Sequence, residues 1–283
     1  MNVRQLDMSR RTIAVAAALI GTVSLAIGAH AALNMRALDA AKAAVSTAEV
    51  TGSVGRTSRL ALVIGNGHYP DANAPLSQSI NDARALSSSL RKGGFDVDMV
   101  EDASKDDMVR AVNRLKSKIT RDSVVMLFFG GYGVQAGRES YMLPVDAVIW
   151  KESDVRRQGV SIESVLEMMK EQGAKAKLVV VDASRRNPYE RRFRSYSHGL
   201  APISAPDNAL ILSSASPGKV VDDGRGEHSV LVGELLNNLN AQGSAESVFN
   251  KTRVAISRAS EGDQVPTVSS SLLEDVQFDQ AGG

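Results

Sequence analysis

The segment KLVVVDASRRNP, residues 177–188, joins an apolar run to polar side chains that could carry out chemistry. Its three consecutive valines precede Asp182 and Ser184, and β-branched apolar runs of this length are typical of buried strands. In open α/β sheets, ligands bind at the C-terminal ends of such strands. Ser184 is therefore a candidate nucleophile. A serine hydroxyl group attacks only when a neighbouring base activates it, so without such a base Ser184 would be the remnant of a nucleophile.

Cysteine and histidine usage limits this chemistry further. The chain contains no cysteine, which excludes disulfides, thiolate metal sites and a cysteine nucleophile. Its four histidines are scattered without metal-ligand spacing, at His30, His68, His198 and His228. The acidic stretch VVDDGRG, residues 220–226, offers two aspartates, which are too few for a recognisable calcium loop. The sequence therefore predicts no metal site.

Two glycine clusters match phosphate-binding turns only in part. In GNGHYP, residues 65–70, Pro70 occupies the place of the third glycine. The second cluster, FFGGYGVQAG at residues 128–137, precedes ESYMLPVDA, which has the pattern of extended chain and not of a helix N-terminus. We therefore predict a loop after the first strand, and no nucleotide or other cofactor.

The elements that must position Asp182 and Ser184 alternate between strand and helix patterns. With 283 residues and 43% hydrophobic content, the chain can form one sizeable domain. Strand-length apolar runs lie at residues 60–65, 95–100, 123–129, 177–182 and 209–214, and helix-period segments lie at residues 79–92, 105–119, 162–172, 231–239 and 245–259. This alternation predicts an α/β fold in which helices cover both faces of a mostly parallel sheet.

The N-terminal region has the pattern of a targeting segment. Three arginines precede an uncharged apolar run, residues 12–29, and an Ala-His-Ala sequence ends this run. We expect export, either with a signal peptide cleaved between Ala31 and Ala32 or with the run retained as a membrane anchor. The stretch SRRTIA, residues 9–14, resembles the start of a twin-arginine signal, so this route and the general secretory route both stay open.

Composition sets the remaining boundaries. The signal peptide or anchor covers residues 1–31, a flexible linker rich in Ala, Ser, Thr and Gly covers 32–58, the folded domain covers 59–278 and a disordered tail covers 279–283. The folded domain shows no internal repeat.

Eight sequence blocks, taken in order, resemble a known family. They are LALVIGNGHY, INDARALSSSLRKGGFDV, MLFFGGYG, YMLPVDA, LVVVDASRRNP, GLAPI, SASPGKVVDDG and QVPTVSSSL. Together they cover roughly residues 59–273 and are similar to the peptidase domain of bacterial caspase-like proteins, the metacaspase-type branch of the caspase family. The resemblance implies a three-layer α/β/α sandwich around a mostly parallel sheet of about six strands. Combined with the export pattern, it implies a periplasmic domain or one tethered to the inner membrane.

The resemblance also implies where catalytic residues would stand. In that family, a strand leading to Gly-His-Gly delivers the catalytic histidine, and a strand leading to Asp-Ala-Cys delivers the nucleophilic cysteine. This chain has Tyr132 and Ser184 at these two places, and Arg186 where an acidic residue is expected. A hydroxyl group is far less acidic than a thiol, and a phenol is a poor proton acceptor at neutral pH. The loss of both groups predicts a homologue without peptidase activity.

Other groups of the cleft match the family. The backbone N–H groups of Gly133 and Ser184 take the oxyanion-hole positions. Asp82 and Asp182 take the positions of an acidic pair that, in metacaspases, binds an arginine or lysine side chain. From the residues alone, Asp82 could instead favour a helix N-terminus, and Asp182 could pair with Arg185 or with backbone amides. Both interpretations stay open.

The loop at residues 185–196 combines arginines with aromatic residues. The arginines are Arg185, Arg186, Arg191, Arg192 and Arg194. Such a cluster could contact an anionic lipid surface or an acidic partner, whereas export disfavours nucleic acid. A solvated loop neutralised by Glu190 is the alternative. Because the formal net charge of the chain is +1, any basic contact must be local.

These features predict a catalytically inactive caspase homologue of the cell envelope, which binds peptide or protein partners with basic side chains in the former substrate cleft. An alternative is an endopeptidase that uses Ser184 as an unusual nucleophile and prefers Arg or Lys. Its base would come from a loop that borders the cleft in the family, at Lys219, His198 or His228. A second alternative is a structural module of the envelope.

Overall fold

The computed structural model describes residues 57–70, 75–183, 188–189, 199–221, 226–239 and 243–278. The predicted signal peptide or anchor, most of the predicted linker and the predicted tail lie outside these ranges. Ser184, His198 and the five arginines of the basic loop lie outside them as well. Within the described ranges, no helix has both the length and the apolar composition needed to cross a membrane.

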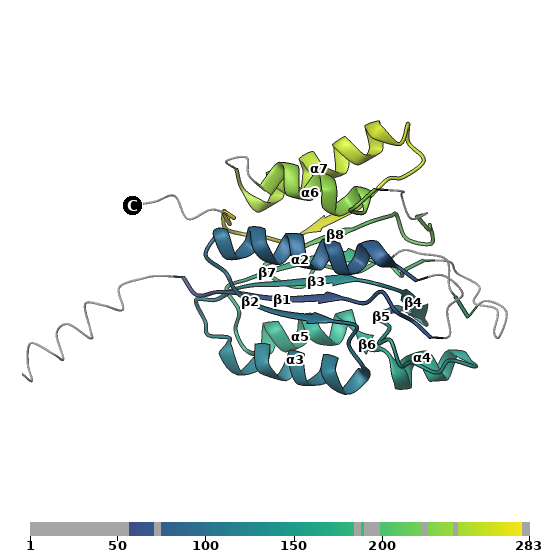
Figure 1. The fold of residues 1–283 in the computed structure, drawn as a ribbon. Coiled ribbons are helices and arrows are strands. Elements are labelled where there is room, and N and C mark those ends of the chain that lie inside the picture. The colour runs from purple at the N-terminus through teal and green to yellow at the C-terminus, as the bar shows by residue number, and fades with distance from the viewer. Residues whose placement is uncertain are drawn as a thin grey trace, which may run out of the picture. The chain divides into compact units, whose positions relative to one another are not determined.

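In the described part of the chain, six strands form the main sheet (Figure 1). In spatial order they are β2 (Asp96–Glu101), β1 (Arg59–Gly65), β3 (Val124–Gly130), β7 (Ala176–Asp182), β8 (Ala209–Ser213) and β9 (Thr267–Ser270). β9 pairs antiparallel with β8 at one edge, and every other neighbouring pair is parallel. The predicted mostly parallel sheet of about six strands is confirmed.

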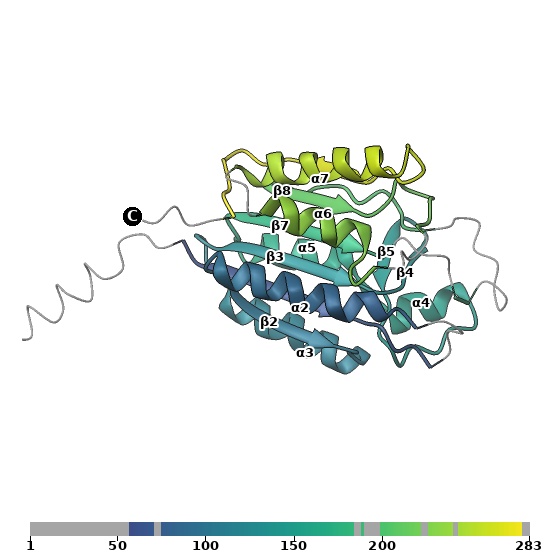
Figure 2. The same ribbon diagram turned by 45° about the horizontal axis from the view of Figure 1, so that its top comes forward.

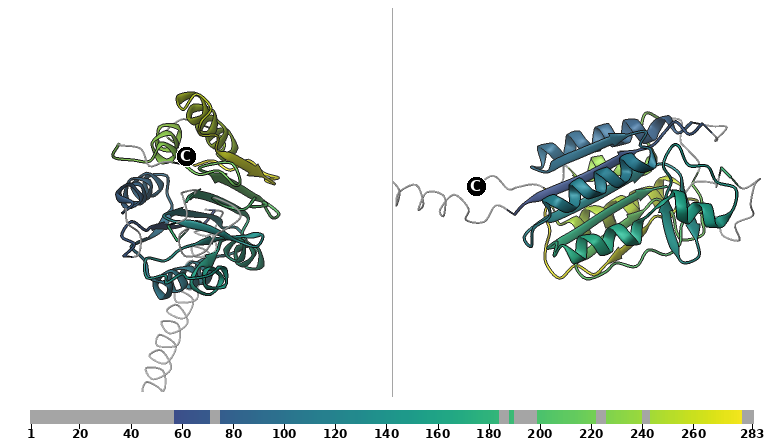
Figure 3. Two further views of the ribbon diagram at one scale, coloured as in Figure 1. Left: turned by 90° about the vertical axis from the view of Figure 1, so that its right-hand side faces the viewer. Right: turned by 90° about the horizontal axis from the view of Figure 1, so that it is seen from below.

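The helices cover both faces of this sheet (Figures 1 and 2). One face carries α2 (Ser77–Lys92), α6 (Val230–Leu239) and α7 (Ala245–Ala259), and the other carries α3 (Lys105–Lys118) and α5 (Ile162–Glu171). Figure 3 shows the same three layers from two further directions. The predicted α/β/α sandwich is therefore confirmed.

Alternation along the central strands divides their apolar residues between two cores. On β3, Leu127 and Phe129 pack in the cluster with α3 and α5, whereas Met126 and Phe128 pack in the cluster with α2, α6 and α7. Side chains alternate across a strand, so a strand covered on both faces must be apolar at every position. This requirement explains why the apolar runs of β1, β3 and β7 were recognisable in the sequence.

Serine side chains fix the starts of several helices. Ser104 accepts a hydrogen bond from the Asp107 N–H at the start of α3, and the Asp107 carboxylate accepts one from the Ser104 N–H, which forms a capping box. Ser161 and Ser244 cap α5 and α7 in the same way through their hydroxyl groups. The predicted helices agree with the observed ones to within two residues at each end.

The patterns did not predict a second, small sheet. Its strands β4 (Gly133–Ala136), β5 (Glu139–Met142) and β6 (Val160–Ser161) are antiparallel, and α4 (Glu152–Gln158) lies beside β4. These strands have two to four residues, which is too short for an alternating pattern to be recognised. The stretch predicted as extended chain after the second glycine cluster contains β5.

Candidate functional site

The parallel strands β1, β3 and β7 end level with one another at the C-terminal edge of the sheet. Past the strand ends, the Gly133 N–H donates a hydrogen bond of 3.1 Å to the carbonyl oxygen of Ala183. Tyr132 directly precedes the first of these residues and Ser184 directly follows the second. The two positions implied to be catalytic therefore belong to neighbouring segments. Because Ser184 itself is outside the described residues, its roles as nucleophile position and oxyanion donor stay predictions.

Tyr132 is a buried aromatic residue, with 7% of its surface exposed. Its ring meets the ring of Tyr69 edge to face, with the ring centres 4.8 Å apart. Its N–H donates to the Tyr69 hydroxyl oxygen over 3.0 Å, and that hydroxyl donates in turn to the carbonyl oxygen of Leu143 over 3.0 Å. Tyr132 is thus part of an apolar cluster, in which aromatic packing stabilises the fold. Its equivalence to a catalytic histidine stays a prediction.

Two glycines let the chain pass close to its neighbours at this edge. A Cβ atom at Gly133 would lie 2.7 Å from the Leu200 side chain and 2.9 Å from that of Ala183. A Cβ atom at Gly131 would lie 2.6 Å from the Tyr69 hydroxyl oxygen. The Gly133 N–H, predicted as an oxyanion donor, already donates to a backbone carbonyl. It would have to leave that carbonyl to hold a substrate oxygen, so the oxyanion hole stays a prediction.

Asp82 and Asp182 lie close enough for their charges to interact. Asp82 projects from α2 with 1% of its surface exposed, and Asp182 ends β7 with 4% exposed. Burial and, to a smaller extent, the negative charge of Asp182 together raise the pKa of Asp82 to about 6. Hydrogen bonds from Ser229 and His228 oppose this rise. The structure therefore brings the predicted acidic pair together.

The hydrogen-bond partners of Asp82 distinguish the two interpretations of this residue. The first turn of α2 contains no acidic residue, and Asp82 follows it, so Asp82 does not favour the start of its own helix. Its two carboxylate oxygens accept the Ser229 N–H, each over 3.2 Å, and one also contacts His228 Nδ1 at 2.9 Å. Ser229 directly precedes α6. Asp82 thus meets the positive end of a different helix.

Polar residues of α2 also hold the loop before α6. Gln78 Nε2 donates to the carbonyl oxygens of Gly226 and His228, over 2.7 and 3.2 Å, and Asn81 Nδ2 donates to that of Glu227 over 3.3 Å. Gln78, Asn81 and the neighbouring aspartate have i, i+3, i+4 spacing, which places them on one face of the helix. Sequence analysis missed this loop contact, although the polar stripe was a usable signal.

The groups considered as bases for Ser184 have different environments. His228 directs Nδ1 to Asp82. Lys219 is exposed in the turn after β8, and His198 lies outside the described residues. Within the described ranges, no cluster of three potential metal ligands exists.

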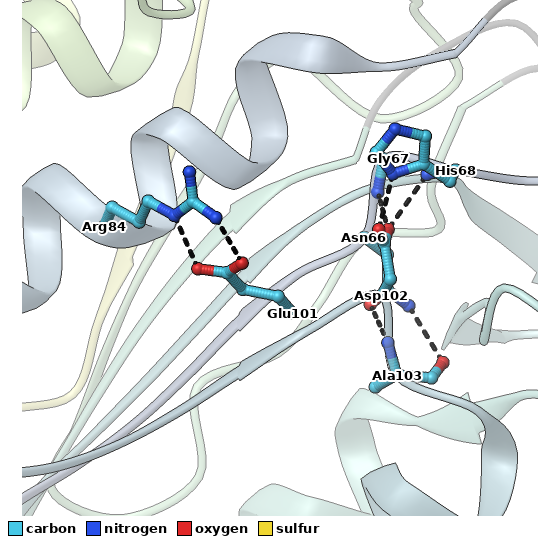
Figure 4. Close-up of polar contacts among 7 residues, drawn as sticks. All are labelled: Asn66, Gly67, His68, Arg84, Glu101, Asp102 and Ala103. Carbon is cyan, nitrogen blue, oxygen red and sulfur yellow. Dashed lines mark hydrogen bonds and ion pairs between the residues drawn. The ribbon is translucent and has the colours of Figure 1, made fainter.

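A second histidine–aspartate contact lies at the ends of β1 and β2 (Figure 4). Asp102 accepts hydrogen bonds from the Gly67 and His68 N–H groups, over 2.8 and 2.9 Å, and from His68 Nδ1 at 2.5 Å. Burial alone would raise the pKa of Asp102, but these hydrogen bonds together outweigh it and the pKa is lowered. This contact joins the ends of β1 and β2, whereas Tyr132 follows β3, on the other side of β1.

Asn66 anchors the loop after β1 from the inside. It is fully buried, its Nδ2 donates to the Leu143 carbonyl oxygen over 3.0 Å, and its Oδ1 accepts the Ala103 N–H over 2.8 Å. At the last residue of β2, Glu101 accepts two hydrogen bonds from Arg84 of α2, of 2.7 and 2.6 Å (Figure 4). The Asn66 contacts fix the start of the predicted GNGHYP loop.

The described part of the domain has a groove and a smaller cavity. A groove of about 330 Å³ lies between residues 200–204 and the strands β8 and β9, and it is lined largely by apolar residues such as Ile203 and Val268. A smaller cavity of about 190 Å³ lies at the other end of the sheet, where Val124 and Ala176 begin β3 and β7. Of these two, the groove adjoins the C-terminal edge of the sheet, because Leu200 lines the groove and also lies beside Gly133.

The match to a known family spans nearly all of the described domain. Residues 58–277 match the caspase domain. This chain belongs to the caspase-domain family. Among relatives, it is 28% identical over 146 residues to the mucosa-associated lymphoid tissue lymphoma translocation protein 1 homolog of Mus musculus, and 28% identical over 136 residues to the Homo sapiens protein. The matches cover 50% and 47% of this chain.

The match of the caspase domain to these relatives is local. It covers 17% of the mouse protein and 16% of the human one, so the chain spans about a sixth of their length. The comparison therefore supports the family and the domain predicted from the eight sequence blocks. The roles of Tyr132 and Ser184 as replaced catalytic positions stay predictions.

Proposed function

We propose that this caspase-domain chain binds a basic side chain of a peptide or protein partner in its cleft without cleaving the partner. The observation that supports the proposal is the buried pair Asp82 and Asp182 at the C-terminal edge of the sheet. Two carboxylates in one pocket repel each other, and an arginine or lysine side chain relieves this repulsion through charge-assisted hydrogen bonds.

The absence of cleavage follows from the replaced groups. A serine needs a positioned base, and the residue at the histidine position, Tyr132, packs instead against Tyr69 in an apolar cluster. Loss of both nucleophile and base costs on the order of a million-fold in comparable hydrolases. The apolar groove beside Leu200 and Ile203 then provides a surface for the rest of the partner.

A matched pair of peptides tests the binding. We expect the full chain to bind a labelled tetrapeptide amide that contains one arginine, and to bind the citrulline analogue much more weakly because it is neutral but has the same shape. Asp82→Asn should weaken the arginine peptide by about tenfold to a hundredfold, the range for losing one charged hydrogen bond. Asp102→Asn, at the other histidine–aspartate contact, is the control and should leave the dissociation constant unchanged.

Turnover measurements test the second half of the proposal. The wild-type chain and Ser184→Ala should be equally inactive toward a fluorogenic arginine substrate. Cleavage by the wild type that Ser184→Ala abolishes would show a working peptidase. Equal affinity for the arginine and citrulline peptides would refute the acidic pocket.

We also propose that the domain works outside the cytoplasm, released or tethered through residues 12–29. The apolar run and its preceding arginines support this location. N-terminal sequencing of the protein from its own host should give a chain that begins at Ala32, or an intact chain in the membrane fraction. An intact chain in the soluble cytosolic fraction would refute export.

A further inference from the structure

His228 is the solvent-facing member of the contact with Asp82. The imidazole has 28% of its surface exposed, whereas the Asp82 side chain has 1% exposed. A ligand that arrives from solvent can therefore reach the histidine but not the carboxylate. Any basic side chain that binds Asp82 must first displace one of the groups already in contact with it.

The other group on Asp82 is fixed in place. The Ser229 N–H donates to both carboxylate oxygens, and the Ser229 hydroxyl oxygen accepts the Val232 N–H at the start of α6. Gln78 and Asn81 hold the preceding backbone through three carbonyl oxygens. A backbone amide held on both sides cannot leave without moving α6. The His228 side chain can leave by rotation about its own two side-chain bonds.

We infer that His228 is a displaceable side chain that closes the acidic pocket, and that a basic ligand side chain binds by taking its place on Asp82. The inference rests on the proposed function and adds the residue that controls access to the pocket. Both occupants are nitrogen donors to the same carboxylate oxygen, so they compete directly.

Binding of a basic ligand depends on pH in a defined direction. Among the described residues, the titratable groups that face Asp82 are His228, from the loop before α6, and Asp182, from the end of β7. Because the pKa of Asp82 is raised to about 6, acidification from pH 7.5 to pH 6.0 begins to neutralise the carboxylate. A neutral carboxyl group attracts a cationic side chain much less strongly than a carboxylate does, so acidification weakens binding of a basic ligand.

Dissociation constants for the arginine tetrapeptide at pH 7.5 and pH 6.0 test the inference. We expect His228→Ala to bind about fivefold more tightly than the wild type at pH 7.5, as for loss of one competing hydrogen bond. Between pH 7.5 and pH 6.0 the wild type and the variant should each lose about twofold in affinity, because both keep the Asp82 carboxyl group with its raised pKa. His68→Ala is the matched control, because it removes the histidine of the other aspartate contact, and it should behave as the wild type.

His228→Ser provides a second variant if the alanine variant unfolds. Its side chain is too short to reach Asp82 where the imidazole does but keeps a polar group in the loop, so this variant should also bind the peptide more tightly than the wild type. Wild-type affinity in His228→Ala at both pH values, with binding still lost in Asp82→Asn, would overturn this inference alone. Weaker binding in His228→Ala would overturn it as well, because His228 would then position Asp82 for the ligand. Absence of binding in every variant would overturn the proposed function together with it.

Discussion

Within the described residues, two contacts join a histidine to an aspartate through the same atoms, in opposite environments. In the first, the His68 and Asp102 side chains have 71% and 31% of their surfaces exposed, and in the second, the His228 and Asp82 side chains have 28% and 1% exposed. Each imidazole directs Nδ1 to a carboxylate oxygen, at 2.5 and 2.9 Å. The pKa of Asp102 is nevertheless lowered, whereas that of Asp82 is raised to about 6. The histidine therefore does not decide the charge state of its partner.

The surroundings of each aspartate decide its charge state. Asp102 is partly solvated and accepts two backbone N–H groups, so its hydrogen bonds outweigh its partial burial. Asp82 is buried beside Asp182, and its hydrogen bonds do not offset both burial and repulsion. An arrangement that makes ionisation unfavourable lowers stability near neutral pH, and such arrangements are more frequent at functional sites than elsewhere. This difference supports the proposed binding role of the buried contact, whereas the exposed contact holds the loop after β1.

The largest effect on stability is expected at Asn66. This residue anchors the loop after β1, which carries His68 of the exposed contact. Asn66→Ala would leave the buried Ala103 N–H and the Leu143 carbonyl oxygen without this amide partner. We expect a loss of about 3 kcal/mol in the free energy of unfolding, measured by urea denaturation at pH 7.

Asn81→Ala is the control for the same substitution. Among the described residues, Asn81 donates a hydrogen bond of 3.3 Å to the Glu227 carbonyl oxygen at the surface, and its loss should cost about 0.5 kcal/mol. Equal losses in the two variants would mean that the loop after β1 does not depend on its buried amide.

Much of the fold was predictable because its signals are local. The valines of β7 and the serine caps of α3, α5 and α7 lie within a few residues of the elements that they define. The contact between His228 and Asp82 joins residues 146 positions apart, and no local pattern specifies which polar residue a distant loop will place on a carboxylate. The positions of Asp82, Asp182 and Tyr132 were predicted through the family resemblance. The packing of Tyr132 against Tyr69 and the engaged N–H of Gly133 were not, because both depend on close approach of separate segments.

The next effect concerns how stability changes with pH at the buried contact. The pKa of a carboxyl group in an unfolded chain is about 3.9. Because the folded value for Asp82 is about 6, the folded state binds more protons than the unfolded state between these two pKa values. The contribution of the protonated Asp82 carboxyl group to stability is therefore complete below about pH 4 and is lost as pH rises through 6. The advantage of the wild type over Asp82→Asn should therefore shrink by about 2 kcal/mol between pH 4.5 and pH 7.5.

Urea denaturation of both proteins at the two pH values measures this change. The difference between the proteins removes the pH effects of all other groups, provided that these are shared. A difference that stays constant with pH would mean that the Asp82 carboxyl titrates as it does in an unfolded chain, and the electrostatic basis of the comparison would be wrong.

The smallest effect on stability is expected for Asp102→Asn. The pH dependence of this effect has the opposite sign to that expected for Asp82→Asn. Asparagine keeps an acceptor for the backbone amides and tolerates the φ angle of 44° at this residue, so we expect a loss of about 0.5 kcal/mol at pH 7. Because the pKa of Asp102 is lowered, the ionised carboxylate stabilises the fold above about pH 4, and this contribution is lost as pH falls through the folded value. Urea denaturation at pH 7 and pH 3.5 should show the wild-type advantage shrinking on acidification, whereas the advantage over Asp82→Asn grows. If the wild-type advantage changed in the same direction on acidification for both variants, burial would not be the cause of the difference between the two contacts.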